Sequence, residues 1–156
     1  MKQFGGLAIF CTLVASCVTS NSPKVVSLAS AGIRYTTDGH GGSDTLKRPG
    51  VQDFLAGERA GAVPILIRHL ADQTPTNSNV NGESGVSLGY VCFDVPCHIL
   101  KPTQWFDMDC GDCGLWSAVR PDYSIPIKIT PENHRETLAA QERWQRLLDS
   151  GDLVPE

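Results

Sequence analysis

The stretch that most constrains the fold is Gly61–Asp72, whose apolar residues follow a helical period. Four of them are spaced at positions i, i+3, i+4 and i+7, which places them on one face of a helix. Pro64 is compatible with the first turn of this helix, and Pro75 follows its end. A helix with a single apolar face must pack against another element, so the stretch predicts a small, mainly α domain. The four apolar residues are Val63, Leu66, Ile67 and Leu70.

The composition indicates a folded domain and argues against binding to nucleic acid. The chain has 156 residues, of which 41% are apolar and 19% are charged, as in an ordinary single domain with a core. The net charge is −4, and the sequence contains no long run of lysine and arginine that could neutralise phosphates. Nucleic acid is therefore not an expected partner.

The N-terminal residues have the organisation of an export signal. A lysine precedes the apolar run Phe4–Ala15, which is too short to span a bilayer but suits the core of a signal peptide. The run leads into Leu13-Val14-Ala15-Ser16-Cys17, which resembles the lipobox of bacterial lipoproteins. In that family the cysteine is acylated and becomes the new N-terminus, so the resemblance implies a lipid on Cys17. Val14 stands where that family prefers leucine.

This resemblance implies three parts and a location. Residues 1–16 are expected to form the signal peptide, residues 17–45 the lipidated cysteine with a flexible tether, and residues 46–156 a helical domain. The expected place is the bacterial cell envelope, anchored to the outer membrane and facing the periplasm. The membrane and an unidentified envelope protein are the expected partners. The alternative is cleavage by ordinary signal peptidase after Ser20, which would release a secreted or soluble periplasmic protein without Cys17.

A short helix is predicted over Val51–Ala60, directly before the apolar stretch described first. Two consecutive helices with a short connection resemble one unit of a HEAT repeat, in which two antiparallel helices stack. The resemblance covers only Val51–Thr76, and repeat arrays normally need about three units. It therefore implies a HEAT-like hairpin inside a compact helical domain.

Two more helices complete the expected domain. Apolar residues over Val86–Val95 again have helical spacing, and Pro96 is expected to end or kink that helix. Cys97 follows the proline, where a loop geometry is possible. A C-terminal helix is predicted to begin at Thr130 and to end at Ser150. Its apolar face is predicted to consist of Thr137, Ala140, Trp144, Leu147 and Leu148.

A long irregular loop is predicted over residues 101–129, which contain several prolines together with Cys110 and Cys113. Two further cysteines, Cys92 and Cys97, precede this loop. In an oxidising compartment, four cysteines favour two disulfides. The preferred pairing joins Cys92 to Cys110 and Cys97 to Cys113, which would fasten the loop to the helix before it. A zinc site formed by the four thiolates and a redox pair formed by Cys110 and Cys113 are the alternatives.

Trp105 and Trp116 lie in the same loop and are the candidate anchors for a protein partner. The sequence contains no G-x-S-x-G, H-E-x-x-H or phosphate-binding motif, so no catalytic residue, metal ligand or cofactor is predicted. Three segments look similar to a group of uncharacterised exported bacterial proteins, and this likeness supports the fold and the location only. They are Asp72–Thr76, Gly89–Val95 and Asp109–Leu115.

The expected function is a membrane-anchored, non-catalytic binding or structural module. The alternative is a secreted redox protein, zinc-binding protein or enzyme that uses the region of Cys110 and Cys113. Both expectations follow from the cysteines and the export signal rather than from a catalytic motif.

Overall fold

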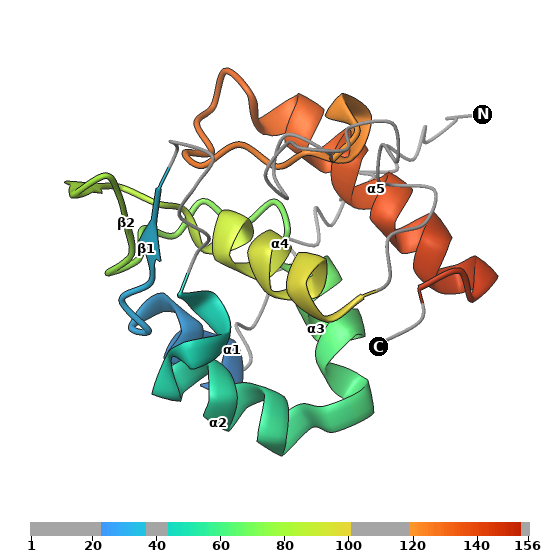
Figure 1. Ribbon diagram of the computed structural model, residues 1–156. Coiled ribbons are helices and arrows are strands. Elements are labelled where there is room, and N and C mark those ends of the chain that lie inside the picture. Colours follow the sequence, from blue (N-terminus) through green and yellow to red (C-terminus); the bar gives the residue numbers. More distant parts are fainter. Residues whose placement is uncertain (1–22, 37–43, 101–118, 154–156) are drawn as a thin grey trace, which may run out of the picture.

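Helices make up most of the structure, a computed structural model that describes residues 23–36, 44–100 and 119–153 (Figure 1). The predicted mainly α class is confirmed. The α-helices are α1 (Pro23–Ala29), α2 (Pro49–Glu58), α3 (Ala62–Arg68), α4 (Leu88–Ile99) and α5 (His134–Ser150). Short 3-10 helices are η1 (Thr45–Lys47), η2 (Arg59–Gly61) and η3 (Pro121–Tyr123).

Helix α4 lies at the centre of the domain, with the other helices arranged around it (Figure 1). Ten consecutive residues, from Leu88 to Cys97, are buried. A helix that is surrounded on all sides must be apolar on all sides, which explains the composition of this segment. Helices α1, α3 and η1 contact α4 directly, and Trp144 of α5 packs edge-on against Phe93 with ring centroids 6.0 Å apart.

Pro96 lies inside α4 and does not end it, so of the two predicted outcomes, an end or a kink, the end is wrong. The helix continues to Ile99, so Cys97 lies on a buried turn of α4 rather than in a loop. A proline inside a helix removes one backbone hydrogen bond and costs about 3 kcal/mol. The apolar side chains buried on both sides of Pro96, including fully buried Val95, offset this cost.

At Gly89, α4 packs closely against the turn that follows α3. A Cβ atom at this position would overlap the carbonyl oxygen of Leu70 and would lie 2.6 Å from Cδ1 of Ile129. The N–H of Gly89 donates a hydrogen bond to the carbonyl oxygen of Asp72 (2.9 Å). This bond satisfies one of the N–H groups that the start of a helix leaves without an intrahelical partner. Glycine is therefore required here by the close contact of α4 with the backbone of Leu70.

Helices α2 and α3 follow one another, as predicted, but they pack mainly on different partners. The short helix η2 joins them. Helix α2 packs mainly on α1, whereas α3 packs mainly on α4 and α5. In Figure 1, α2 runs along the lower edge of the domain and α3 turns away from it toward α4. The predicted hairpin therefore differs from a HEAT unit, in which the two helices stack on each other.

Residues 23–36 belong to the folded domain, although the sequence predicts a tether that reaches residue 45. Val25 and Leu28 of α1 are fully buried, as is Ile33 after it. Helix α1 packs on both α2 and α4. The tether prediction is wrong for these residues because their few apolar side chains fill space left by distant helices, and a short local pattern does not reveal such contacts.

A small sheet ties this N-terminal segment to the middle of the chain. Strand β1 (Arg34–Tyr35) pairs in parallel with β2 (Asn79–Val80), and β2 pairs antiparallel with β3 (Glu83–Ser84). The β2–β3 turn contains Asn81 and Gly82 with φ of 50° and 84°, as a type I′ turn requires. The Asn-Gly pair is the sequence signal for this hairpin.

Helix α5 begins at His134 with Asn133 as its N-cap, three residues after the predicted N-cap Thr130. The side chain of Asn133 accepts a hydrogen bond from the N–H of Thr130 and donates one to the carbonyl of Lys128, both at 2.9 Å, so these residues form a turn before the helix. The helix ends at Ser150, as predicted, and the next residue is a glycine with φ of 78°. The predicted apolar face is confirmed: Thr137, Ala140, Trp144 and Leu147 are buried, and Leu148 is partly buried.

Candidate functional site

Two of the predicted site cysteines lie inside the domain. Cys92 and Cys97 are free thiols on α4, with 0% and 4% of their surface exposed. Burial raises the pKa of both thiols, and a nearby carboxylate raises it further in each case, that of Asp72 for Cys92 and that of Asp94 for Cys97. Both sulfurs are therefore protonated at neutral pH and unreactive while the domain is folded.

The remaining predicted site residues lie outside the described residues. Lipidation, the disulfide pairing, its zinc and redox alternatives and the tryptophan anchors therefore stay predictions. These residues are Cys17, Trp105, Cys110, Cys113 and Trp116.

Beside Cys97, α4 carries a fully buried carboxylate, that of Asp94. Its Oδ2 accepts a hydrogen bond from the hydroxyl of Thr45 in η1. Its Oδ1 lies 3.3 Å from Nδ1 of His98, and the same nitrogen lies 2.9 Å from the backbone carbonyl oxygen of Asp94. Because both of these neighbours are acceptors, Nδ1 of His98 carries a proton. A buried charge needs such partners, and Asp94 finds them on two elements.

The hydroxyl of Tyr35, on β1, lies next to this cluster. It is buried beside Thr45 and Asp94, but its geometry is not that of a hydrogen bond to any described residue. Burial, followed by the charge of Asp94, raises the pKa of this hydroxyl. The Tyr35 ring packs edge-on against Tyr90 with centroids 5.1 Å apart. The cluster therefore holds β1 and η1 against α4, which is a structural role.

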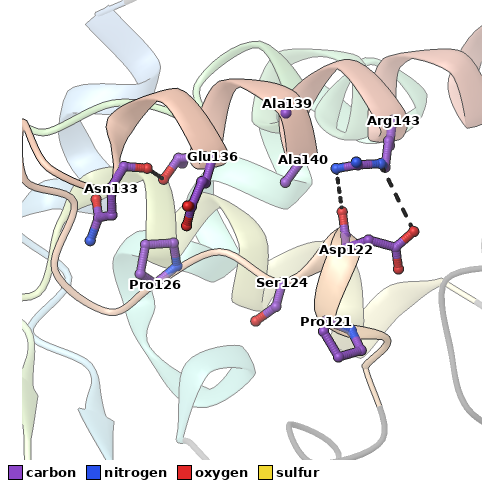
Figure 2. A pocket seen from close by; sticks show the side chains of 10 residues that line it. Pro121, Asp122, Ser124, Pro126, Asn133, Glu136, Ala139, Ala140 and Arg143 are labelled. Carbon is purple, nitrogen blue, oxygen red and sulfur yellow. Dashed lines mark hydrogen bonds and ion pairs between the residues drawn. The ribbon is translucent and has the colours of Figure 1, made fainter.

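Two open grooves lie along different faces of α5. The first, here called the proline groove, separates α5 from residues 121–126 and has a volume of about 350 Å³ (Figure 2). Pro121 and Pro126 line it on the side away from α5. At one end Arg143 donates a hydrogen bond to the carbonyl oxygen of Asp122 (2.9 Å), and Figure 2 shows Glu136 toward the other end. The proline groove therefore contains both positively and negatively charged groups.

The second, here called the histidine groove, lies between residues 68–74 and α5 and has a volume of about 460 Å³. His69 and Asp72 line it, with Nδ1 of His69 3.3 Å from Oδ2 of Asp72. Oδ1 of Asp72 accepts a hydrogen bond from the N–H of Thr74 (2.9 Å). The hydrogen bond from His69, assisted by Thr74 and opposed by burial, lowers the pKa of Asp72 to about 2. Asp72 is therefore ionised and orients the imidazole, with Nδ1 of His69 as the donor.

The α5 side of the histidine groove contributes a clamp and an apolar side chain. The side-chain amide nitrogen of Gln141 donates to the carbonyl oxygens of Ile67 and Arg68, at 2.9 and 2.8 Å, which fastens α5 to the end of α3. Leu138 is 41% exposed in the groove, and His134 lines it beside the helix start. The groove thus combines charged, polar and apolar groups.

Sequence reasoning does not find either groove. The two sides of the histidine groove come from residues more than 60 positions apart, such as Asp72 and His134. The one local signal is the spacing His69-x-x-Asp72 at the end of a predicted helix, which places the two side chains within reach of each other. In the part of the chain that the structure describes, no three His, Cys, Asp or Glu side chains gather as metal ligands would.

Within residues 23–36, 44–100 and 119–153, no helix has both the length and the apolar character needed to cross a membrane. Comparison with protein-family models, with curated proteins and with solved structures finds no match to this chain.

Proposed function

We propose that this chain is a binding module, without catalytic activity of its own, that is anchored to a bacterial membrane through a lipid on Cys17 and faces the periplasm. The observation that carries the proposal is the pair of open grooves along α5. Several of their side chains, including Asp72, Gln141 and Arg143, are held in place by hydrogen bonds within the protein. Such preorganised concave surfaces favour ligand binding because little ordering entropy is lost.

The chemistry of the described cysteines supports binding rather than catalysis. Nucleophilic catalysis by cysteine needs an accessible thiolate beside a base. Cys92 and Cys97 are enclosed by the core, and burial raises the pKa of each thiol. The nearest histidine in sequence, His98, is held by Asp94 instead. The two thiols and the imidazole of His98 therefore contribute to the packed interior of the domain.

The distance between the predicted anchor and the fold supports a position close to the membrane. Helix α1 begins at Pro23, six positions after Cys17. Six residues span at most about 21 Å, at roughly 3.5 Å per residue. A lipid on Cys17 would therefore hold the domain near the bilayer surface, where the grooves could meet ligands of the envelope.

Metabolic labelling with a palmitate analogue tests the anchor in a bacterial host. We expect the full chain to be labelled, the Cys17→Ala variant to remain unlabelled, and the matched control Cys11→Ala to keep the label. A label that persists without Cys17, or that is missing from the full chain, would contradict the anchor. One bound zinc with four free thiols in the purified protein would favour the zinc-binding alternative instead.

A further inference from the structure

We propose that the histidine groove binds an aliphatic carboxylate, a ligand in which a carboxylate group stands next to a branched apolar side group. A free peptide C-terminus ending in leucine and a small aliphatic acid share this chemistry. The inference rests on the proposed function, because it names the ligand class of the binding module.

The charges that line the groove favour an anion. The carboxylate of Asp72 is already engaged by hydrogen bonds with His69 and with the N–H of Thr74. Arg68 lines the same groove, is exposed, and has no acidic partner among the described residues. Its Nε donates to the carbonyl oxygen of Pro64 (3.2 Å), which orients the guanidinium and leaves its two terminal nitrogens to bind a ligand. A planar guanidinium matches the two oxygens of a carboxylate.

The helix ends around the groove also favour a negatively charged ligand. Arg68 is the last residue of α3, where exposed carbonyl oxygens would repel an anion. Gln141 donates to two of these oxygens, those of Ile67 and Arg68, and so reduces that repulsion. On the other side stands His134, the first residue of the 17-residue helix α5, whose N-terminal end is favourable for negative charge.

Leu138 supplies the apolar contact. A single exposed leucine is ordinary on a protein surface. Here, however, Leu138 lies in the same groove as Arg68, with Ala71 on the opposite side. The volume of about 460 Å³ is in the range of small-molecule sites, large enough for the last residues of a peptide. The ligand is therefore expected to place its carboxylate at Arg68 and its side group at Leu138.

The test uses two matched pairs of probes titrated into the ¹⁵N-labelled protein and followed by NMR. N-acetyl-leucine is compared with N-acetyl-leucinamide, and the peptide acetyl-Gly-Gly-Val-Leu is compared with its C-terminal amide. We expect both acids to shift the amide signals of residues 68–74, and both amides to bind at least tenfold more weakly. A peptide acid that binds more tightly than N-acetyl-leucine identifies a chain end as the ligand, and equal affinities identify a small acid.

Variants locate the contact. Arg68→Gln should weaken binding of N-acetyl-leucine at least tenfold, whereas the control Arg135→Gln, on α5 outside the groove, should change it less than twofold. Leu138→Ser should weaken binding of N-acetyl-leucine and leave binding of acetate unchanged. Equal binding of acids and amides, no binding of either, or full affinity in Arg68→Gln would overturn the inference. Lipid labelling reports on Cys17 alone. A protein that is labelled but does not bind these acids would therefore support the proposed anchor and overturn only the proposed ligand.

Discussion

The imidazole of His98 is held by Asp94, one turn earlier on α4, through both the backbone carbonyl (2.9 Å) and the buried carboxylate (3.3 Å). Burial by itself would lower the pKa of His98, because it disfavours the charged ring. The hydrogen bond and the negative charge of Asp94 outweigh burial and raise this pKa above its ordinary value of 6.5. Protonated His98 therefore stabilises the folded domain.

The stability of the domain should depend on pH through His98. The pKa of His98 is higher in the folded protein than in the unfolded chain. The stabilisation that His98 contributes is therefore complete below pH 6.5 and is lost as the pH rises through the pKa of the folded state. Urea unfolding at a series of pH values should show a free energy of unfolding that falls above pH 6.5. His98→Gln should flatten this slope, and His134→Gln should keep it. An unchanged slope in His98→Gln would assign the effect to another group.

Thr45 and Asp94 should be energetically coupled, because the threonine hydroxyl donates to the buried carboxylate. Asp94→Ala should cost about 3 kcal/mol, as expected when one partner of a buried polar pair is removed. Thr45→Val should cost about 1.5 kcal/mol, since it removes a hydrogen bond to a charged group. In a double-mutant cycle measured by urea unfolding, the combined cost should be smaller than the sum. Strict additivity would show that the two side chains act independently.

Gly89→Ala should destabilise the domain by about 3 kcal/mol or prevent folding, because the added methyl group would overlap the backbone of Leu70. The matched control is Gly57→Ala on α2, where no atom lies within 4 Å of the added Cβ. This control should stabilise the domain by about 0.5–1 kcal/mol, since alanine is the better helix former. Thermal unfolding followed by circular dichroism measures both. Equal effects would mean that the turn at Leu70 can move away from α4 at little cost.

After chemical reduction, Cys92 and Cys97 should be protected from alkylation in the folded protein. Their burial keeps reagents away, and their raised pKa keeps the thiols protonated. Mass spectrometry of iodoacetamide-treated protein should find both residues unmodified at neutral pH and modified in denaturing urea. Rapid modification of either residue in the folded protein would contradict its enclosed position. Peptide mapping without reduction tests the predicted pairing with Cys110 and Cys113.

Local periodicity predicts the elements whose burial follows one helical face. All four apolar residues of the stretch around α3, from Val63 to Leu70, are buried, and the face of α5 centred on Trp144 is confirmed. These predictions succeed because each helix buries one stripe of its own residues. The glycine after Ser150 likewise marks the end of α5, since the conformation it adopts is local.

The errors at Pro96 and α1, and the failure to find the histidine groove, have a common physical cause, which is that distant residues decide the outcome. Pro96 remains helical because the packing around α4 offsets a local penalty. Helix α1 is ordered because α2 and α4 cover it. The histidine groove depends on a hydrogen bond between Gln141 and Ile67, 74 positions apart in the chain. No short segment of the sequence contains both partners of such contacts.

The enclosure of α4 also determines when the protein can finish folding. Its side chains need α1 and α3, which come earlier in the chain, and Ile129 and Trp144, which come later. A nascent polypeptide that stops at residue 100 would leave Phe93 without its aromatic neighbour from α5. The interior therefore closes only after residues 134–150, which form α5, have left the ribosome and can pack on α4.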